Sequence, residues 1–569
     1  MGRPMRIARH ARGGRGFVVA ALLACSAGLA AEPQIRIPRV ERMPNLPKPF
    51  RIRNWKAVAV GFDRLAFDPN AAGEHLPLIW LVRRPGQAEP VTFGLPSYVG
   101  DYRKDANGRR HHEAVTCLGA VLGATVAGID KSRGRHNWVR MCEFYYDRAT
   151  KGLITNRCDD RAGGSFWYDV FPHVVYYGLA DRYPKVGRAS EIVRRTADRW
   201  REACEAMKGP DGRCDFNHTA FNFRTMKPVD NGRWTEPDAA AGIAWLQYAA
   251  YVRGKSPNHL VAARACMDFL ESRRKNPYYE VLLPFGAYTA ARMNAETGCT
   301  YDVAKLVTWC FDRSDARPDW MVIADRWSGH DCHGLAGAVN RPPHRPAGGG
   351  YAFTMNTFVM AWPLVPMVRY DGRFARAVGK WMLNAANAAR LLYPNAHPPR
   401  RQSFPGWKGD PHSVIAYEGL QHLWHGKEQL YAAGDPVRYR WGPKTDLGMY
   451  GSAYVGIFGG IVSRTDEKAI LQLDLLATDF FRRKAWPTYL YFNPHAEERA
   501  VRVEAGKSPR DLYDCLSKRF LARKVTGRTR FTVPADGAVV LVLAPAGGKV
   551  TRRGKQLLID GVVVDYRAE

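Results

Sequence analysis

The sequence predicts a mainly α plus β protein in which a toroid of helical hairpins is followed by an antiparallel β-sandwich. Three observations predict it. Apolar and amphipathic segments alternate through the middle of the chain, long polar links separate successive pairs, and the C-terminal part changes to a strand-like period of two. With 569 residues, 46% of them hydrophobic, the chain can form large cores in about two or three domains.

Residues 1–31 are predicted to be a secretory signal peptide. Arginines from Arg3 to Arg15 form a basic region, residues 17–24 an apolar region, and Gly28-Leu29-Ala30 a small-residue cleavage site. The apolar run is too short to span a bilayer. We therefore expect a secreted or periplasmic protein. Residues 22–25 also resemble a lipoprotein cleavage box, so membrane attachment would require lipidation at Cys25.

The formal net charge is +30. Clustered Lys and Arg would attract an acidic glycan, but the same charge could be spread over a solvated surface, and both interpretations stay open. The export signal and the absence of a recognisable binding module argue against a nucleic-acid partner. None of the 11 cysteines forms a CxxC pair, and Cys204 and Cys214, on either side of a Gly/Pro turn, are the pair we expect first to form a disulfide.

Residues 32–110 are predicted to form a linker and a small N-terminal β element. The stretch 34–53 is rich in Pro and Arg and indicates a linker or a surface strap. Three short runs with strand-like composition follow, at residues 57–60, 78–82 and 91–93.

Residues 111–465 are predicted to form the toroid. The apolar segments begin near Ala114, Phe166, Ala239, Val281 and Phe353. The amphipathic segments begin near Asn137, Gly187, Asn258, Tyr301 and Gly372. An apolar helix must be covered on several sides and an amphipathic one only along its stripe, so the first set predicts an inner ring and the second an outer ring. Pro172 and Pro284 indicate that the residues just before each of them belong to a rim loop rather than to a helix.

A sixth hairpin is only partly legible. Residues 414–424 could form one helix, but residues 449–461 are so rich in Gly and Tyr that they could be extended instead. Residues 466–569 are predicted to form the β-sandwich, with strands at 470–475, 489–492, 500–504, 531–533 and 539–543 and a terminal hairpin-like stretch at 549–566.

The links between hairpins are long and those within hairpins are short. In a ring of hairpins the two kinds emerge at opposite ends, so the long links at 150–165, 208–235, 312–352 and 393–412 should share one rim. Long loops in a compact domain are usually functional. The active site is therefore expected on that rim.

These links combine aromatic, charged and amide side chains. Aromatic faces stack on the C–H faces of a sugar, and charged groups bind its hydroxyls. The predicted substrate-binding residues are Asn217, Arg224, Arg233, Trp234, Trp327, His330, His333, Tyr351 and His412. A glycan-binding protein without catalytic activity would need only these residues, so it stays open as an alternative function.

At this point the chain resembles the (α/α) toroid carbohydrate-active enzymes, which include the six-hairpin glycosidases and the toroid polysaccharide lyases. The resemblance extends from about His112 to the C-terminus. It rests on the architecture and on C-terminal runs at 493–494, 511–514, 533–536 and 539–545, and no family-defining catalytic motif accompanies it. It implies an (α/α)6-type fold and activity on an oligo- or polysaccharide, neutral or acidic.

Hydrolysis of a glycosidic bond requires two carboxyl groups. The rim offers Asp230, Glu236, Asp238, Glu280, Asp331 and Glu418. Glu236 and Asp238 are explained by the stability that acids give to the first turn of a helix. Glu280 starts an apolar helix, where solvation does not explain an acid, and Asp331 lies in the dense polar stretch 327–334.

Elimination next to a uronate needs a base, a neutraliser for the carboxylate and an acid. Toroid lyases typically use an Asn-His pair and a later Tyr, and Asn217-His218 followed by Tyr278 or Tyr279 matches that order, with Arg224 near the uronate carboxylate. We expect an exported enzyme in which hydrolysis is slightly favoured over elimination. The predicted catalytic residues are Glu280, Asp331, Asp230, His218 and Tyr279. Whether these side chains converge on one cleft is the structural test of this assignment.

A metal site is the weaker interpretation of residues 330–333. His330, Asp331, Cys332 and His333 are potential zinc ligands, but two residues between histidines suit one helix face poorly. No metal and no cofactor is expected, and the sequence does not determine the oligomeric state.

Overall fold

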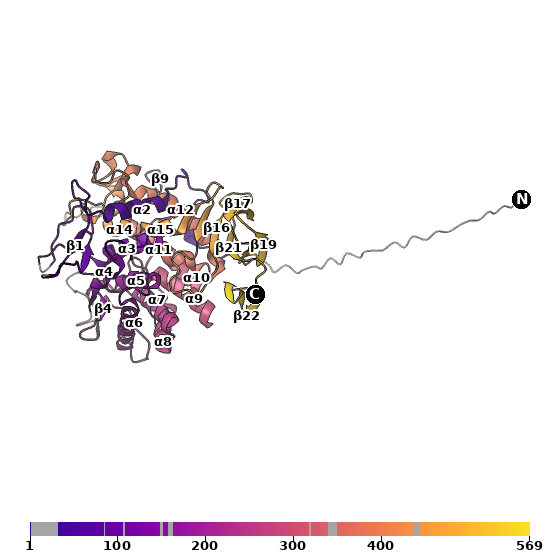
Figure 1. The fold of residues 1–569 in the computed structure, drawn as a ribbon, viewed down its shortest axis with the longest axis horizontal. Helices are drawn as coiled ribbons and strands as arrows, with labels where there is room; N and C mark the ends of the chain where they lie inside the picture. The colour runs from indigo at the N-terminus through magenta and orange to yellow at the C-terminus, as the bar shows by residue number, and fades with distance from the viewer. Residues whose placement is uncertain are drawn as a thin grey trace.

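The computed structural model describes Met1 and residues 32–568, apart from residues 85, 106–107, 148–151, 158–162, 318–319, 339–349 and 437–442. The predicted signal peptide, Cys25 and Cys158 lie outside the described residues. Figure 1 shows a helical body joined to a sheet-rich C-terminal lobe. Within the described part of the chain, no helix is both long and apolar enough to cross a membrane.

The inner ring consists of helices that are buried on nearly every side. Its members are α3 (Ala114–Val126), α5 (Phe166–Arg182), α7 (Ala239–Gly254), α9 (Leu283–Thr297), α11 (Thr354–Met367) and α15 (Val455–Ile461). Each packs against the next, and α15 packs against α3, which closes the ring. The first five begin within two residues of the predicted apolar segments.

The outer ring consists of amphipathic helices. Its long members are α6 (Ala189–Ala206), α8 (Pro257–Ser272), α10 (Val303–Phe311) and α12 (Ala375–Ala388). In α6 the buried stripe includes Ile192, Val193, Thr196 and Trp200. The predicted segment near Asn137 contributes only the short helix α4 (Trp138–Met141).

The outer helix of the sixth hairpin comes from the N-terminal segment. Residues 57–60, predicted as a strand, lie in helix α2 (Trp55–Ala66), so that prediction was wrong. The side chain of Asn54 caps this helix by accepting from the Ala57 N–H, and Trp55, Val58 and Phe62 bury one stripe of it. Helix α2 packs against α15, as the labels in Figure 1 show.

The inner helix of the sixth hairpin was obscured by its glycines. Residues 449–461 are helical, forming α14 (Met449–Ser452) and α15, whereas residues 419–424 form strand β12 (Gly419–Trp424) rather than the predicted helix. A Cβ atom on Gly456 would lie 1.9 Å from the carbonyl oxygen of Gly123 in α3. The glycines thus allow two helix backbones to touch where the ring closes.

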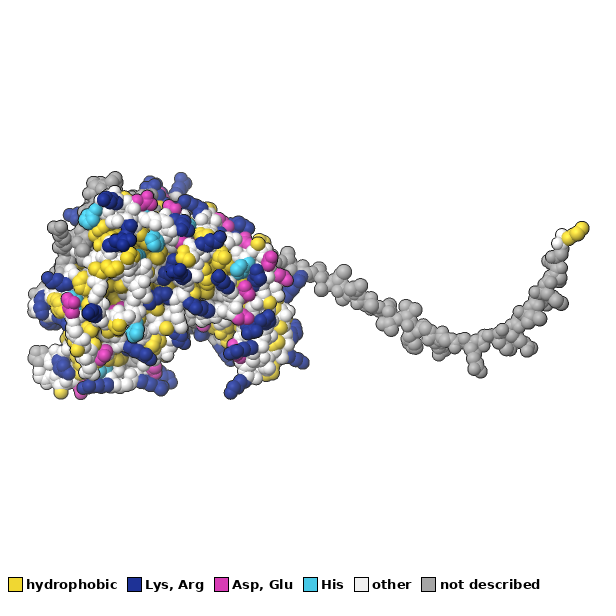
Figure 2. Space-filling view, turned by 90° about the horizontal axis from the view of Figure 1, so that it is seen from above, with side chains coloured by type: hydrophobic (Ala, Val, Ile, Leu, Met, Phe, Trp, Pro, Cys, Tyr) yellow, Lys and Arg dark blue, Asp and Glu magenta, His cyan; other side chains and the backbone are white. Residues whose placement is uncertain are grey.

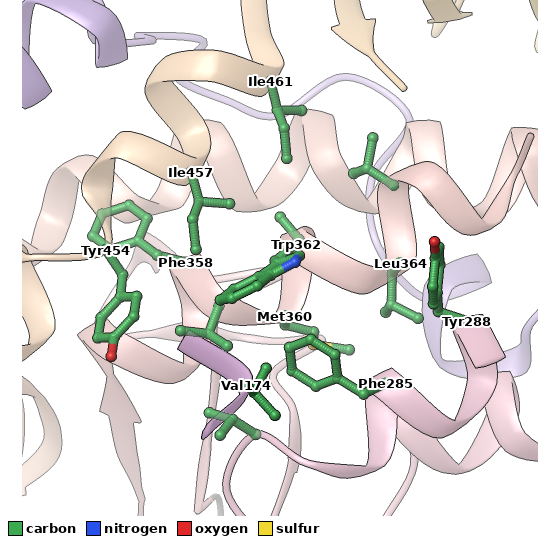
Figure 3. Packing of buried hydrophobic residues seen from close by; sticks show 14 of the residues in the cluster. Val174, Phe285, Tyr288, Phe358, Met360, Trp362, Leu364, Tyr454, Ile457 and Ile461 are labelled. Carbon is green, nitrogen blue, oxygen red and sulfur yellow. The ribbon is translucent and has the colours of Figure 1, made fainter. Parts of the chain in front are cut away.

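The axis of the toroid is filled with large apolar side chains. Figure 3 shows Trp362 of α11 at the centre, with Phe285 of α9, Val174 of α5 and Ile457 of α15 around it. Trp362 is 1% exposed. The barrel therefore has no open channel at this level, and free space remains only towards its ends.

The C-terminal lobe is an antiparallel β-sandwich. Its main sheet has the order β14 (Val462–Arg464), β15 (Leu471–Asp474), β16 (Thr488–Phe492), β21 (Ala538–Pro545), β18 (Arg510–Asp514) and β19 (Arg519–Val525). The ribbon of β17 (Arg499–Glu504) and β20 (Arg528–Val533) packs on one face. Val539, Leu541 and Leu543 of β21 face this ribbon, whereas Val540 and Val542 join the toroid core beside α12.

The remaining strands belong to the terminal hairpins and to the rim. Strands β22 (Val550–Arg553), β23 (Gln556–Ile559) and β24 (Val562–Asp565) form a small antiparallel sheet. The long links form a rim sheet of β13 (Lys427–Ala432), β12, β11 (Tyr351–Phe353), β10 (Ala336–Ala338) and β7 (Trp320–Val322). Strands β1 (Trp80–Val82) and β2 (Thr92–Gly94) pair antiparallel and coincide with two of the three runs predicted for the small N-terminal β element.

The described cysteines are free thiols. The expected bridge between Cys204 and Cys214 is not formed, because the Cys214 thiol donates to the Cys204 carbonyl oxygen at 3.2 Å. The Cys204 sulfur instead lies 3.7 Å from that of Cys266. Figure 2 shows Lys and Arg side chains spread over the visible face rather than gathered in one patch.

Candidate active site

A cavity of about 250 Å³ lies over the N-terminal ends of the inner helices. Its wall includes residues at the starts of α3, α5, α9, α11 and α14. The long links lead into these starts, so their ends meet at one rim, as the link lengths predict. The lining residues are Ser97, Tyr98, Arg103, Glu113, Val115, Ser165, Trp167, Tyr168, Tyr279, Glu280, Phe353, Met355, Glu418, Asp435 and Tyr450.

Glu280 lies in the loop before α9, and its backbone is held in an uncommon conformation. Its φ angle is 55°, in the left-handed region that costs free energy for a residue with a side chain. The helix begins only at Leu283, with Pro284 in its first turn, which confirms the rim loop predicted before Pro284. The same prediction before Pro172 was wrong, because α5 begins at Phe166 and contains Pro172. Nδ2 of Asn356 donates to the Glu280 carboxylate at 2.9 Å. Burial nevertheless raises the pKa of Glu280 to about 7.

Glu113 occupies the equivalent position before α3. Oγ of Ser97 donates to its carboxylate at 2.7 Å, and Nδ2 of Asn156 donates at 3.2 Å. Burial alone would raise the pKa of Glu113, but hydrogen bonds from His111 and Ser97 outweigh it and hold the pKa below its usual range. One cavity thus contains two glutamates whose pKa values are shifted in opposite directions.

Glu418 is the most heavily hydrogen-bonded acid of the cavity. The hydroxyls of Tyr98 and Tyr450 donate to its carboxylate at 2.7 and 2.5 Å, and the Asp435 N–H donates at 2.6 Å. Burial and then the nearby Asp435 carboxyl raise the pKa of Glu418. Its geometry suits a group that fixes two tyrosines in the cavity wall.

Tyr168 projects into the cavity from the first turn of α5. It is 48% exposed, which is unusual for a tyrosine beside an apolar helix core. Burial of its hydroxyl and then the carboxylates of Glu113, Glu280 and Glu418 raise its pKa. Tyr168 therefore stands among three of the acids that line the cavity.

Glu236 and Asp238, at the start of α7, brace the wall from behind. Glu236 accepts hydrogen bonds from Oγ of Ser165, the N–H of Trp167 and Nε1 of Trp234. Oδ2 of Asp238 accepts from the Tyr279 N–H at 3.2 Å, next to Glu280. Both acids therefore position cavity residues. Their interpretation as first-turn acids was wrong, because α7 begins at Ala239 and its first turn contains no acid.

An arginine joins Trp234 to the cavity wall. The Arg317 guanidinium lies 3.9 Å from the ring centre of Tyr279 and 4.4 Å from that of Trp234. Trp234 is 36% exposed. Trp234 itself does not line the cavity, and its substrate-binding role stays a prediction.

The predicted Asn-His pair lies outside this cavity. Nδ1 of His218 is 3.1 Å from the exposed carboxylate of Asp230, and Oδ1 of Asn217 accepts from Arg273 at 2.6 Å. Arg224 and Arg233 are exposed in the same link. None of these side chains lines the cavity, and their proposed roles stay predictions.

The predicted residues of the third link surround a second cavity. Asp331 and His330 line it, while Asp331 accepts from Nδ1 of His333 at 2.6 Å. Trp327 is buried and stacks on His422 with ring centres 5.0 Å apart. Among the described residues, no three His, Cys, Asp or Glu side chains group as metal ligands.

The two remaining predicted binding residues differ in position. Tyr351 is buried on β11, close to Glu418 and behind the cavity wall. His412 is exposed on the fourth link. Of the predicted catalytic residues, the structure brings Glu280 and Tyr279 together, while Asp331, Asp230 and His218 lie elsewhere and their catalytic role stays a prediction.

Sequence reasoning missed Glu113 and Tyr168. The signal was present, because Glu113 immediately precedes the first apolar segment just as Glu280 precedes the fourth. Tyr168 lies in the first turn of the second segment, a position that faces the same rim. Ser97, Tyr98 and Asp435 carried no such signal, because they reach the cavity from segments remote in sequence.

No family model and no curated protein matches this chain. Its structure is similar to that of a GH127 β-L-arabinofuranosidase from Geobacillus stearothermophilus, with 10% identity and a TM-score of 0.33 over 79% of this chain and 75% of that one. It is also similar to an unsaturated glucuronyl hydrolase specific for heparin, with 11% identity and a TM-score of 0.33 over 72% and 95%.

A third similar structure is a cellobiose 2-epimerase from Spirochaeta thermophila, with 10% identity and a TM-score of 0.40 over 73% of this chain and 98% of that one. The present chain is an (α/α)6-type toroid followed by an antiparallel β-sandwich. That assignment rests on its own closed ring of helices and on its C-terminal sheets.

Proposed function

We propose that this protein is an exported glycoside hydrolase in which Glu280 is the general acid and Glu113 the ionised carboxylate. One observation carries the proposal. The two glutamates line the same cavity, and their surroundings shift their pKa values in opposite directions. Such divergence assigns one carboxyl to donate a proton and the other to act as an anion.

The reaction follows from these protonation states. Protonated Glu280 donates its proton to the glycosidic oxygen as the bond to the anomeric carbon breaks. The Glu113 carboxylate takes a proton from the attacking water or attacks the anomeric carbon itself. The ring of Tyr168 offers a face for the sugar, and the Tyr98 and Tyr450 hydroxyls, fixed by Glu418, fit its hydroxyl groups.

Elimination has less support from the geometry. The Asn217 and His218 side chains lie outside the cavity, and the described lining residues include no histidine. The cavity arginine, Arg103, is paired with Asp101 at 2.7 Å. A role in glycan binding without cleavage remains a separate hypothesis, which loss of activity in a variant that still binds would exclude.

Export is part of the proposal and is carried by the N-terminal residues. The basic and apolar segments of residues 1–31 fit a signal peptide, and the mature protein would act on a glycan outside the cytoplasm. N-terminal sequencing of the protein recovered from the culture medium or periplasm tests it. An intact N-terminus on protein confined to the cytoplasm would contradict export.

The test of the reaction uses the mature chain on a panel of neutral and acidic polysaccharides. New reducing ends without the ultraviolet absorbance of an unsaturated uronate indicate hydrolysis. Glu280→Gln should lower the rate by about 10²- to 10⁴-fold while leaving substrate binding intact. Glu497→Gln, whose carboxylate is 77% exposed in the C-terminal lobe, is the matched control. Full activity of Glu280→Gln would overturn the assignment.

A further inference from the structure

A second cavity, of about 550 Å³, contains arginines that the proposed catalytic site does not use. It lies between the N-terminal strap at residues 49–53, the β-turn at Gly329 and the end of α12. Its lining residues are Pro49, Arg51, Ile52, Arg53, Gly329, His330, Asp331, Arg390, Leu391, Asn395 and Ala396. Three lining side chains are thus guanidinium groups and one is an imidazole.

The single carboxylate of this wall is already engaged. Asp331 accepts from Nδ1 of His333 at 2.6 Å and from the Lys48 N–H at 3.3 Å. The guanidiniums of Arg51, Arg53 and Arg390 form no ion pair with any carboxylate in the described part of the chain. Burial lowers the pKa of Arg390 and of Arg53, and the nearby carboxylates of Asp331 and Asp410 partly oppose that shift. Two carboxylates thus offset part of the charge of the three guanidiniums, and the cavity keeps a net positive charge.

Two more arginines reinforce this charge. Arg326 donates to the Gly329 carbonyl oxygen, and Arg401 donates to Oε1 of Gln429 at 2.6 Å. Neither pairs with a described carboxylate. Burial and then Arg390, Arg401 and Arg326 lower the pKa of His330, which places these guanidiniums near its ring.

Two buried arginines elsewhere in the core are paired with carboxylates. Arg369 pairs with Asp479 at 2.8 Å and Arg376 with Asp536 at 2.8 Å. Since an arginine loses hydration when it is partly buried, a group of unpaired arginines around a cavity implies an anion that completes them.

Arg53 is held ready for such an anion. Its guanidinium lies 4.1 Å from the ring centre of Tyr393, and its Nη2 donates to the Ser413 carbonyl oxygen at 2.9 Å. Its Nη1 is buried without a hydrogen-bond partner among the described residues. The stacked ring and the carbonyl fix the guanidinium in place, which lowers the entropy cost of binding.

The two cavities share one end of the toroid. Helix α11 begins at the catalytic cavity, where Phe353 and Met355 form part of the wall. Helix α12 returns antiparallel to α11, so the 3-10 turn that follows its end, which contains Arg390, lies on the same rim but in the outer ring. A glycan bound in the central cavity would have to extend outwards along this rim to meet the arginines.

We propose that this second cavity is a distal subsite that binds the carboxylate or sulfate groups of an acidic glycan. Guanidinium groups bind both kinds of oxyanion through paired N–H donors. This inference rests on the proposed function only in taking the protein to be a glycan-cleaving enzyme. The predicted binding of an anionic glycan does not itself require cleavage. It identifies the substrate class as a polyanionic polysaccharide.

The test measures binding by the full mature chain, using dextran sulfate with dextran as its neutral match, and polygalacturonate with its methyl ester. Calorimetry should show binding of the charged member of each pair only. The double variant Arg51→Gln with Arg390→Gln should weaken that binding about tenfold. Arg528→Gln, whose side chain is 82% exposed in the C-terminal lobe, removes one charge elsewhere and should leave it unchanged.

Each outcome separates this subsite from its alternatives. Equal loss in Arg528→Gln would show that the affinity reflects only net charge, and equal binding of the neutral members would also overturn the proposal. If the arginine variants cleave an acidic glycan with unchanged KM, the subsite is wrong while the hydrolase stands. If charged glycans bind at these arginines but no glycan is cleaved, the hydrolase is wrong while the subsite stands.

Discussion

Asn356 holds Glu280 through two hydrogen bonds from a single amide group. Its Nδ2 donates to the Glu280 carboxylate at 2.9 Å and to the Glu280 carbonyl oxygen at 3.2 Å. One side chain from α11 thus fixes both the backbone and the carboxylate of a residue with a left-handed φ angle. The proposed acid is positioned by a neighbouring inner helix rather than by its own.

Replacing Asn356 by Ala should shift the pH dependence of catalysis. Loss of the amide donor destabilises the ionised form of Glu280, so its pKa rises further above about 7. Because the proton is needed on the acid, the alkaline limb of kcat/KM should move to higher pH, and kcat should fall about tenfold as the carboxyl loses its orientation. The pH–rate profile measures both effects.

The matched control is Asn294→Ala. Asn294 lies in the last turns of α9, away from the cavity, and donates to the Tyr301 carbonyl oxygen. Its pH–rate profile should match that of the wild type. An alkaline limb that moves to lower pH in Asn356→Ala would contradict the role of Glu280 as an acid.

Replacing Glu113 by Gln should remove the anionic partner. The amide keeps the shape but cannot act as a base or nucleophile, so kcat should fall about 10²- to 10⁴-fold with little change in KM. In the wild type the acidic limb should lie below the usual pKa of a glutamate, because Ser97 and His111 lower that of Glu113. Steady-state kinetics of Glu113→Gln, with Glu497→Gln as the control, measure this loss. A kcat of Glu113→Gln equal to that of the wild type would show that Glu113 takes no part in the reaction.

Glu280 should also make stability depend on pH. Its folded pKa is raised from 4.5 to about 7, so the folded state favours the protonated form. This contribution is fully present below pH 4.5 and is lost as pH rises through about 7. The free energy of unfolding of Glu280→Gln should therefore equal that of the wild type near pH 4 and exceed it at pH 8 by about 2 kcal/mol. This value is smaller than the full pKa shift gives, because solvent that reaches the cavity screens the charge.

Urea unfolding at the two pH values measures this difference. Glu497→Gln serves again as the control, because its carboxylate is largely exposed. A Glu280→Gln variant that is less stable than the wild type at pH 8 would show that its surroundings stabilise the ionised form.

Replacing Gly456 by Ala should disrupt closure of the ring. The added Cβ would overlap the backbone of Gly123, so α15 and α3 must separate. The expected loss is above about 2 kcal/mol in the free energy of unfolding. Gly254→Ala is the control, since nothing lies within 4 Å of its Cβ position at the end of α7, and it should be neutral or slightly stabilising. Equal stability of both variants would contradict the close contact of α3 and α15.

Arg292 joins the toroid to the loop between β15 and β16 of the C-terminal lobe. It is 1% exposed, its Nη1 donates to the Phe480 carbonyl oxygen at 3.0 Å, and its Nε lies 3.2 Å from Glu296. Arg292→Met should cost about 3 to 5 kcal/mol, because Glu296 and the carbonyl oxygen lose their buried donors. Arg194→Met, at a side chain 61% exposed, should change stability by less than about 0.5 kcal/mol.

Thermal and urea denaturation compare the two arginine variants. A cost for Arg292→Met no larger than that for Arg194→Met would show that the segment at residues 480–481 does not depend on this contact.

The inner ring was largely predictable because each of its helices is apolar on every side. Ala114, Phe166 and Ala239 begin helices in the structure as they begin apolar runs in the sequence. The sixth hairpin was not predictable, because its outer helix α2 lies near the N-terminus, far in sequence from its partner α15. In addition, the glycines that made α15 look extended are there for its close contact with α3. Composition does not reveal contacts of that kind.

The sequence by itself determined the alternation of inner and outer helices, five strands of the C-terminal lobe, the rim where the long links end, and Glu280 as a candidate on that rim. These follow from periodicity, link length and the cost of an acid beside an apolar helix, all of which are local properties of the chain. Only the tertiary structure decided which acids share a cavity, because Glu113 and Glu418 reach it from opposite ends of the toroid sequence. It also placed Asp331 and His330 outside that cavity and beside Arg390. Closure of the ring sets the distances between segments that are remote in sequence, and no single segment determines them.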